Sequence, residues 1–467
     1  MKTSLKPYII SALYLLFALF IDQSFAQKKR LMVQQGHSSF VETIAFSPDD
    51  SKIFTGSVDA SFKIWDTKTG KLIQVVRLDN PTDYISGKAF FLKNGKQVLF
   101  RPLNNIQLWD LEKQERIWLN KNIPSDAELF NVSNKGDKIL LVDKLNPLSK
   151  SIVLDINTQK KLIDVSFGLV ADYKANEKGS VQMAKTQDAV FSPDGKALMS
   201  GLDNGEVIWL DIPEKRVFAQ LTKDSVSIQK VGVSADGLSF FALNSNNLMN
   251  VWDVYNQKLL NSFQLPKEDT IIAFWPNQLS FVVSNANQLI LKDLNTGQLI
   301  QKFILSDKKR YHYDPVISSN KATLLSLDNF MFMAWSVKTG KLLYKIESSI
   351  TTSIPYRYSP DSTHITQVTL ASKDYSLNKQ KLIATKGKRQ GDPNIYLKDA
   401  KTQELKATIY SGFSNEKAWI ITTPKGKYDA NEEGLQYLHY VKGRDKILPL
   451  PKRDRNRVKG LLKKILK

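Results

Sequence analysis

A unit of about 40 to 45 residues recurs along this chain, and it limits the fold more than any other sequence feature. In each unit an apolar, strand-like segment ends at an aspartate or serine that is followed by a turn. These positions are Asp66, Asp110, Asp155, Asp211, Asp253, Asp293, Ser336 and Asp399. Five of the seven intervals between them (44, 45, 42, 40 and 43 residues) match the length of one four-stranded sheet of a propeller. Because such a sheet cannot bury both of its faces alone, the repeat predicts an all-β propeller of stacked blades.

Turn residues keep the same phase as these strand ends. Asn94-Gly95, Asp194-Gly195 and Asp236-Gly237 precede the second strand of a unit, whereas Thr69-Gly70 and Thr296-Gly297 follow the third. Gly, Asn and Asp tolerate the positive φ of tight hairpins, so these pairs lie where strands must be connected. The phased units predict eight four-stranded antiparallel blades. Seven blades with a C-terminal subdomain are the alternative.

The first unit carries the most complete set of landmarks, which are Gly36-His37, Gly56-Ser57, Asp59 and Lys63-Ile64-Trp65-Asp66. It resembles a WD repeat of the WD-repeat β-propeller family. The resemblance implies a buried hydrogen-bonded network that is structural rather than catalytic, formed by His37, Thr55 (or Ser57), Asp59 and Trp65. It also implies that a leading strand, Arg30 to Gln35, completes the last blade. Later units keep marker tryptophans at Trp109, Trp209, Trp252 and Trp335.

The N-terminus has the order of a cleavable signal peptide. Lys2 and Lys6 precede the apolar run Tyr8 to Ile21, and Ser24-Phe25-Ala26 supplies the small residues that a signal peptidase requires. The run is shorter than the roughly 20 apolar residues of a membrane span, so we expect cleavage after residue 26 rather than an anchor. The chain contains no cysteine, which excludes disulfides and a cysteine-linked lipid anchor. We therefore expect a periplasmic or secreted protein, with its propeller over 27–411.

The segment after the last repeat, expected to form an extension over 412–467, has its own pattern. Trp419, Thr423-Pro424-Lys425-Gly426, Tyr428-Asp429 and Tyr437-Leu438-His439-Tyr440 occur in that order. This resembles the linker that joins the propeller to a caspase-like peptidase domain in longer, exported bacterial WD-repeat proteins. The sequence ends at Lys467, so we expect no peptidase activity from this chain.

The same segment holds much of the positive charge. The chain has a formal net charge of +20, and residues 442–467 contain eleven Lys or Arg and two Asp. The spacing of Val458, Leu461 and Leu462 predicts a basic amphipathic helix over Arg455 to Lys467. This tail can lie on an anionic membrane surface, bind in a partner's groove, or pack on the propeller as a cap. The basic residues that would make such a contact are Arg455, Arg457, Lys459, Lys463 and Lys464.

The sequence offers little for catalysis. Its four histidines lie far apart, at positions 37, 312, 364 and 439, and neither a phosphate-binding glycine loop nor a nucleophile elbow occurs. We therefore predict no catalytic residue, no metal site and no cofactor. The long intervals before Asp211 and Asp399 indicate two insertions, Ser166 to Lys185 and Lys373 to Asp392, which are candidate contact loops.

A propeller without a catalytic constellation is typical of a scaffold that binds partner proteins, and this is the function we expect. The alternative is an enzyme, or a propeller that binds a small ligand or metal in its central channel, and converging polar residues there would favour it. Nucleic acid is not an expected partner, because basic and aromatic residues do not interleave as in a single-strand groove. These expectations rest on the fold rather than on a site.

Overall fold

The computed structural model describes Lys29 to Leu466 except for positions 81, 104, 121–126, 144–149, 167–183, 223–224, 267–269, 276–278, 286–287, 306–312, 329–330, 349–355, 359–364, 368–374, 378–381, 387–393, 400, 411–412, 414–417 and 443–445. The expected signal peptide and most of the insertion expected over 166–185 lie outside the described residues. The chain divides into two compact units. The ring unit is Val41–Phe62 with Arg77–Ile346, and the C-terminal unit is the described parts of Met1–Phe40, Lys63–Val76 and Glu347–Lys467.

Within the described residues, seven four-stranded sheets each follow the order of the sequence. Blade 1 consists of β2 (Val41–Phe46), β3 (Lys52–Ser57), β4 (Ser61–Asp66) and β5 (Leu72–Arg77). Blade 2 consists of β6 (Ile85–Phe91), β7 (Gln97–Pro102), β8 (Ile106–Asp110) and β9 (Glu115–Asn120). Blade 3 consists of β10 (Ala127–Val132), β11 (Lys138–Asp143), β12 (Lys150–Asp155) and β13 (Lys161–Ser166). Blade 4 consists of β14 (Thr186–Phe191), β15 (Ala197–Leu202), β16 (Glu206–Asp211) and β17 (Arg216–Thr222). Blade 5 consists of β18 (Ile228–Val233), β19 (Ser239–Asn244), β20 (Leu248–Asp253) and β21 (Leu259–Gln264). Blade 6 consists of β22 (Thr270–Trp275), β23 (Ser280–Asn285), β24 (Gln288–Asp293) and β25 (Leu299–Ile304). Blade 7 consists of β26 (Tyr313–Ile317), β27 (Thr323–Asp328), β28 (Met331–Ser336) and β29 (Leu342–Glu347).

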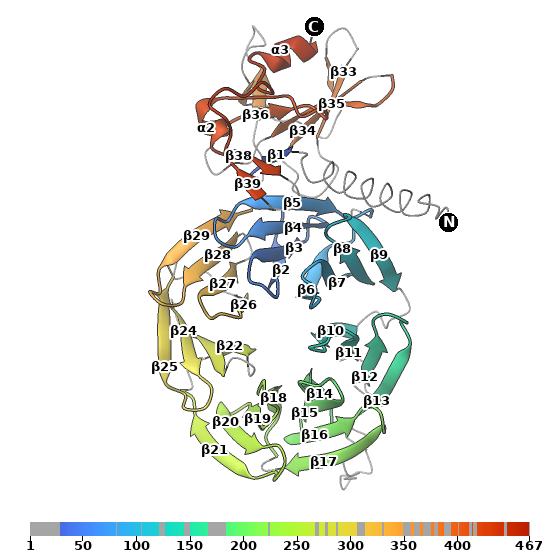
Figure 1. The fold of residues 1–467 in the computed structure, drawn as a ribbon, viewed down its shortest axis with the longest axis vertical. Helices are drawn as coiled ribbons and strands as arrows, with labels where there is room; N and C mark the ends of the chain where they lie inside the picture. Colours follow the sequence, from blue (N-terminus) through green and yellow to red (C-terminus); the bar gives the residue numbers. More distant parts are fainter. Residues whose placement is uncertain are drawn as a thin grey trace, which may run out of the picture. The chain divides into compact units, whose positions relative to one another are not determined.

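The ring closes between blade 1 and blade 7. Strand β2 packs against β6 of blade 2 and against β26 of blade 7, and the innermost strands surround one axis (Figure 1). The Asp50 carboxylate links the end blades, because it accepts hydrogen bonds from the backbone N–H (2.8 Å) and hydroxyl (2.7 Å) of Ser319 and from the backbone N–H of Asn320 (3.0 Å). Among the described residues the ring therefore contains seven four-stranded blades, and blade 7 packs against blade 1; this matches the alternative of seven blades with a C-terminal subdomain rather than the eight blades expected.

The repeated strand-end position has a structural cause. Its side chain caps the following turn: the Asp155 carboxylate accepts hydrogen bonds from the backbone N–H (2.7 Å) and hydroxyl (2.8 Å) of Thr158. These bonds, led by the backbone one, hold the pKa of Asp155 below its ordinary value. The residue four positions after every strand end has a positive φ of 53° to 70°, namely Gly70, Gln114, Gln159, Lys215, Gln257, Gly297, Gly340 and Gln403. The regular spacing of the strand ends in the sequence therefore reflects one turn conformation, which occurs in all eight repeat units.

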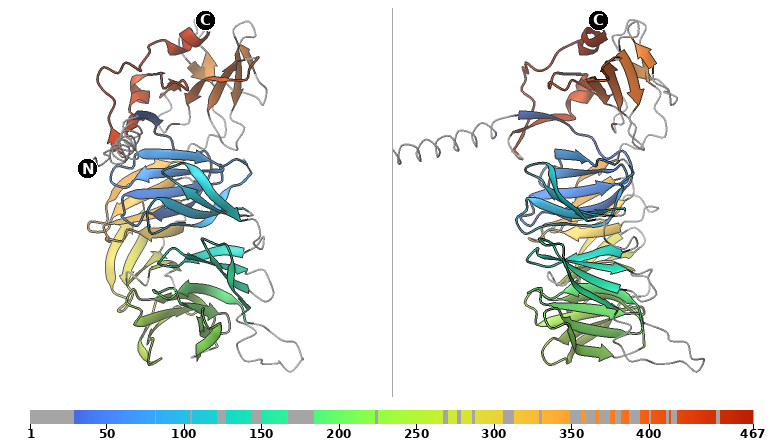
Figure 2. Two further views of the ribbon diagram at one scale, coloured as in Figure 1. Left: turned by 45° about the vertical axis from the view of Figure 1, so that its right-hand side comes forward. Right: turned by 90° about the vertical axis from the view of Figure 1, so that its right-hand side faces the viewer.

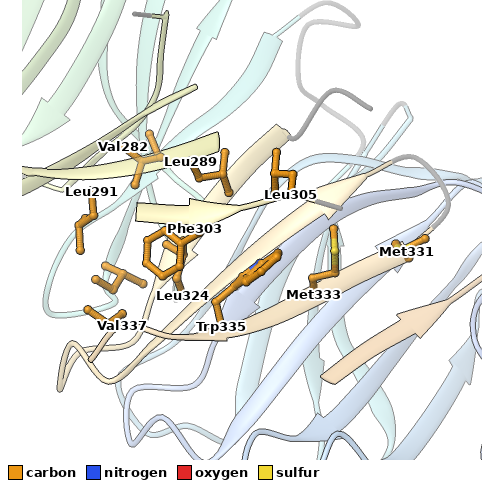
Figure 3. Packing of buried hydrophobic residues seen from close by; sticks show 12 residues of the cluster. Val282, Leu289, Leu291, Phe303, Leu305, Leu324, Met331, Met333, Trp335 and Val337 are labelled. Carbon is orange, nitrogen blue, oxygen red and sulfur yellow. The ribbon is translucent and has the colours of Figure 1, made fainter. Parts of the chain in front are cut away.

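The hydrophobic core lies between neighbouring blades. Between blades 6 and 7, Phe303 of β25 packs edge-to-face on Trp335 of β28 with ring centroids 6.2 Å apart, and Leu289 and Leu324 are fully buried in the same cluster (Figure 3). Equivalent clusters occupy the spaces between the other neighbouring blades of the ring unit, from blade 2 onwards. Burying one such large side chain stabilises the fold by about 1.5–3 kcal/mol.

The leading strand has a different partner from the one expected. In the C-terminal unit, β1 (Lys29–Val33) pairs antiparallel with β38 (Leu438–Lys442), with Leu31 opposite Tyr440, and β39 (Lys446–Leu448) completes a three-stranded sheet. The prediction that Arg30 to Gln35 completes the last blade is therefore wrong. Blade 7 supplies its own outer strand, β29, so its sheet has no vacant position for a strand from the N-terminus.

The eighth repeat unit folds into a six-stranded sheet of the C-terminal unit (Figure 2). This sheet follows the order β32 (Tyr375–Leu377), β33 (Leu382–Lys386), β34 (Ile395–Asp399), β35 (Leu405–Tyr410), β36 (Ile420–Thr422) and β37 (Tyr428–Ala430). It keeps the blade-like turn, since Asp399 accepts a hydrogen bond from the backbone N–H of Thr402 at 2.9 Å. The sheet continues across residue 412, where the extension was expected to begin. The insertion expected over 373–392 contains β32 and β33, so it is not a simple loop. A separate pair, β30 (Tyr356–Tyr358) and β31 (Ile365–Gln367), forms a two-stranded sheet.

The C-terminal helix is shorter than predicted. Helix α3 spans Leu461–Leu466 rather than 455–467, because Gly460 has a φ of 69° and donates its N–H to the Asp429 carboxylate at 2.7 Å. Leu461 and Leu462 are buried against Ile395, Leu397 and Ile421 of the six-stranded sheet. The apolar face of the tail thus packs as a cap, on this sheet rather than on a blade of the ring. A second short helix, α2 (Glu432–Leu435), follows β37.

Candidate functional site

A cavity of about 540 Å³ lies on the axis of the ring unit, and the innermost strands of all seven blades contribute to its wall. Its wall also includes exposed residues of the turns that follow those strands, such as Pro48, Asn134 and Ser319, so the cavity opens to solvent at that end. We call it the axial cavity. Concave sites of this size accommodate a small molecule or a short peptide segment.

A shift of register, of the kind that a β-bulge produces, recurs in the innermost strand of every blade. The register of β14 against β15 shifts between Thr186 and Asp188, and that of β18 against β19 shifts between Ile228 and Lys230. A bulge bends its strand and redirects a side chain. The residue that follows the shift lines the axial cavity in each blade, in order Thr43, Ala89, Asn131, Asp188, Lys230, Ala273 and Val316.

Apolar side chains lie at the open end of the axial cavity, beside the polar residues of the turns. Phe46, Phe91, Val132 and Trp275 are half-buried there, each at or near the end of its innermost strand. Half-buried aromatic side chains of this kind are suited to holding an apolar group of a partner. The axial cavity therefore offers apolar contact area inside a fixed ring of backbone.

Serine–carboxylate contacts keep the surrounding turns in place. The hydroxyls of Ser47 and Ser192 donate to the carboxylates of Asp49 and Asp194, both at 2.6 Å. In blade 5 the hydroxyl of Ser234 donates to Asp236, and this bond holds the pKa of that carboxyl below its ordinary value. These turns are consequently held in a fixed conformation around the opening.

Four charged residues, Asp50, Lys88, Asp188 and Lys230, are among those that line the axial cavity. The buried Asp188 carboxylate accepts a hydrogen bond from the backbone N–H of Val231 at 3.0 Å and joins blade 4 to blade 5. No histidine is among the described residues of the wall. In the part of the chain that the structure describes, no group of three His, Asp or Glu side chains is placed to hold a metal ion.

The residues predicted to form the WD-type network are all buried, and none lines the axial cavity. His37 is 1% exposed, Thr55 and Trp65 are fully buried, and Asp59 is 5% exposed. The Asp59 carboxylate accepts a hydrogen bond from the backbone N–H of Ser61 at 3.0 Å. Their burial agrees with a structural role, while the complete network stays a prediction.

Three of the marker tryptophans, Trp109, Trp209 and Trp335, are buried in the core, and Trp252 is half-buried against it. Trp109 donates its indole N–H to Gln107 at 2.7 Å, and Gln107 in turn donates to Asn105 at 2.9 Å, so blade 2 has a substitute network that the sequence did not suggest. Trp335 donates to the hydroxyl of Ser326 at 3.0 Å. Trp209 and Trp252 both pack on Phe240, with ring centroids 5.9 and 5.8 Å away.

The basic residues of the C-terminal tail differ in how exposed they are. Arg455, Lys459 and Lys464 are exposed, whereas Arg457 donates to the backbone carbonyl of Ala430 at 3.0 Å and helps to fix the segment before α3. The side chain of Lys463 lies outside the described residues. A tail contact with a partner or membrane stays a prediction.

Sequence reasoning missed the residues of the axial cavity, although a signal was present. In blades 1, 4 and 5 the cavity residue lies four positions before the serine of the turn, as with Thr43 and Ser47 or Asp188 and Ser192. Counting back from the Ser-x-Asp turn would have found these three. The bulge that brings them to the wall depends on pairing with the next strand and has no mark of its own.

Comparison with known proteins agrees with this architecture. A model of the WD domain, G-beta repeat, matches residues 28–66. The chain is 22% identical to a putative BTB/POZ domain and WD-repeat protein of Acanthamoeba polyphaga mimivirus over 65% of its own length and 51% of that protein. It is 30% identical to THO complex subunit 6 of Arabidopsis thaliana over 24% of its length and 30% of that protein. It is also 23% identical to a guanine nucleotide-binding protein subunit beta-like protein of Encephalitozoon cuniculi, over 51% and 60% respectively.

The chain thus spans about half or less of the first relatives that it matches. The matched repeat and these relatives support the WD40 repeat family. Among the described residues, no helix has both the length and the apolar character of a membrane span.

Proposed function

We propose that this WD-repeat propeller is an exported, non-catalytic scaffold that holds a partner protein at its axial cavity. The observation that carries the proposal is the set of half-buried apolar side chains at the opening, Phe46, Phe91, Val132 and Trp275, which lie beside turns held by serine–carboxylate hydrogen bonds. WD-repeat proteins generally bind other proteins, and the matched repeat supports the same role for this chain.

The chemistry of the opening favours a peptide segment with an apolar anchor. Binding energy at protein interfaces concentrates in a few desolvated pockets that hold large side chains. The strand ends and serine-capped turns are already fixed by the blades, so little ordering is required when a partner binds. Exposed turn residues such as Asn134 and Ala235 add polar backbone and side-chain groups around that anchor.

Export is the part of the proposal that rests on sequence alone. Lys2, Lys6 and the apolar run before Ser24-Phe25-Ala26 support a signal peptide and a periplasmic or secreted location. Cell fractionation of the full chain, with N-terminal sequencing, should give a mature protein that begins at Gln27. A chain that keeps Met1 and remains in the cytosol would reject export without affecting the scaffold role.

The partner-binding role can be tested in the native cell envelope. A photo-crosslinking amino acid is placed at Phe91, at the opening, and separately at the exposed Lys160 in the outer turn of blade 3 as a matched control. We expect one protein or a small set to be captured reproducibly at position 91 and not at position 160. If the two positions capture the same background proteins, the axial cavity is not the binding site.

A further inference from the structure

Six aliphatic side chains are exposed on the outer strands of blades 5, 6 and 7. They are Leu260 (55% exposed), Leu299 (54%), Ile300 (48%), Ile304 (68%), Leu342 (43%) and Leu343 (53%). We call this set the rim patch. Tyr255, in the turn before β21, flanks it and is 77% exposed.

The rim patch occupies the same repeat positions that blade 1 buries. Counted from the strand end, the seventh residue is Ile73 in blade 1 and Leu260, Ile300 and Leu343 in blades 5, 6 and 7. Ile73 is only 2% exposed. In the C-terminal unit the neighbouring Leu72 donates its backbone N–H to Gln34 at 2.8 Å, and its carbonyl accepts a hydrogen bond from the His439 ring at 2.7 Å. The fold therefore buries this position in blade 1 and leaves it exposed in blades 5, 6 and 7, and also in blade 2, where it is Ile117.

Hydrogen bonds connect two of the outer strands that carry the rim patch to the neighbouring blade. The Asn261 side chain of β21 donates to the backbone carbonyl of Asn295, in the turn of blade 6, at 2.7 Å. The Gln301 side chain of β25 donates to the carbonyl of Val337, in the turn of blade 7, at 3.0 Å. The outer strands of blades 5 and 6 are thus each tied to the next blade, and β21, β25 and β29 follow one another along the outer edge of the ring unit (Figure 1).

The exposed charged residues described on the outer strands and turns that carry the rim patch are lysines, while Glu347 at the end of β29 is half-buried. Within segments 253–266, 293–305 and 336–346, the exposed charged residues are Lys258, Lys302, Lys338, Lys341 and Lys345. The carboxylates that the structure describes in these segments, Asp253 and Asp293, are half-buried and cap turns through the backbone N–H groups of Asn256 (2.7 Å) and Thr296 (2.9 Å). The surface therefore combines aliphatic groups with lysines and exposes no carboxylate among its described residues.

We propose that the rim patch docks the propeller edge-on to an anionic phospholipid surface. Aliphatic side chains that enter the headgroup boundary, surrounded by lysines that attract anionic lipid, are the features of an interfacial membrane contact. Tyr255 suits the same layer, because tyrosine prefers the membrane–water interface. A protein partner fits less well, since protein interfaces are depleted in lysine and enriched in arginine and aromatic residues. The site is separate from the axial cavity and does not depend on the proposed scaffold role.

The test is sedimentation of the purified full chain with vesicles of phosphatidylcholine, with and without phosphatidylglycerol. We expect binding only to the anionic vesicles. The variant Ile300→Ser/Leu343→Ser should weaken it at least about tenfold, because the apolar contact is lost. Lys302→Glu/Lys341→Glu should weaken it by a similar factor through charge.

Matched controls separate the rim patch from other surfaces. Ile117→Ser changes the equivalent position of blade 2, where the side chain is also exposed (43%) but Glu112 and Glu115 lie nearby in the sequence. Lys459→Glu/Lys464→Glu changes the exposed basic tail. Both controls should bind like the unchanged chain, and all variants should keep its circular dichroism spectrum and Tm. Unchanged binding by both rim variants would overturn the proposal, as would loss of binding only in the tail variant.

Discussion

Replacing Ser326 by alanine removes a single oxygen from the interior of blade 7. Ser326 is fully buried and its hydroxyl accepts the indole N–H of Trp335 at 3.0 Å, while Trp335 itself is only 4% exposed. The variant leaves a buried N–H without a partner, which costs about 1–3 kcal/mol of unfolding free energy. A second buried serine provides the opposite case. Ser151 in β12 is also fully buried, but its hydroxyl has no hydrogen-bond partner among the described residues.

Ser151→Ala should therefore leave the unfolding free energy unchanged or raise it by up to about 1 kcal/mol, because no bond is lost and an unpaired polar group is removed. Urea unfolding followed by circular dichroism measures both variants against the unchanged chain. The double variant Ser326→Ala/Trp335→Phe adds a check: once the indole N–H is absent, loss of the hydroxyl should cost much less than it does alone. Equal losses for Ser326→Ala and Ser151→Ala would refute the reasoning, as would a full Ser326→Ala cost that persists beside Trp335→Phe.

Three further predictions concern backbone, packing and protonation. In urea unfolding, Gly340→Ala should lower the unfolding free energy more than Gly426→Ala. Both glycines have a positive φ (67° and 76°), so alanine is strained at either position. A Cβ at Gly340 would also lie 2.5 Å from the backbone carbonyl oxygen of Lys302, whereas a Cβ at Gly426 would have no other atom within 4 Å. Leu461→Ala should cost about 2–5 kcal/mol and increase amide hydrogen exchange in β34–β36, because it opens a cavity under α3. Burial lowers the pKa of His439 below 6.5, so at acidic pH the unfolded chain binds a proton at this histidine more readily than the folded chain does. The unfolding free energy should therefore be retained above about pH 6.5 and fall as the pH drops below it. His439→Gln should reduce this dependence of the unfolding free energy on pH.

The local structure of the blades could be predicted because it follows from short-range chemistry. Asp155 and its equivalents cap a turn within three residues, and the fourth residue takes a positive φ in all eight units. Neither property depends on distant parts of the chain. The strand ends and the turns were therefore found even where the WD landmarks are absent.

Ring closure could not be predicted in this way. Asp50 and Ser319 meet across 269 residues, and Leu31 pairs with Tyr440 across most of the chain. The eighth unit has the same turn at Asp399 as the others, so its sequence contains no sign that its sheet gains β36 and β37 instead of joining the ring. Which blade neighbours which is decided by packing between sheets, and apolar strands of similar composition do not specify that choice.

The binding surfaces escaped prediction for a related reason. The seventh position after the strand end is aliphatic in blades 1, 2, 3, 5, 6 and 7, so its residue type does not separate the buried Ile73 from the exposed Ile300 and Leu343. What differs is whether side chains from elsewhere, such as Gln34 and His439 at Leu72, reach the outer strand. In a repeat protein the same pattern serves as core in one blade and as surface in another. A function carried by the uncovered copies is consequently visible only once the covering parts of the chain are known.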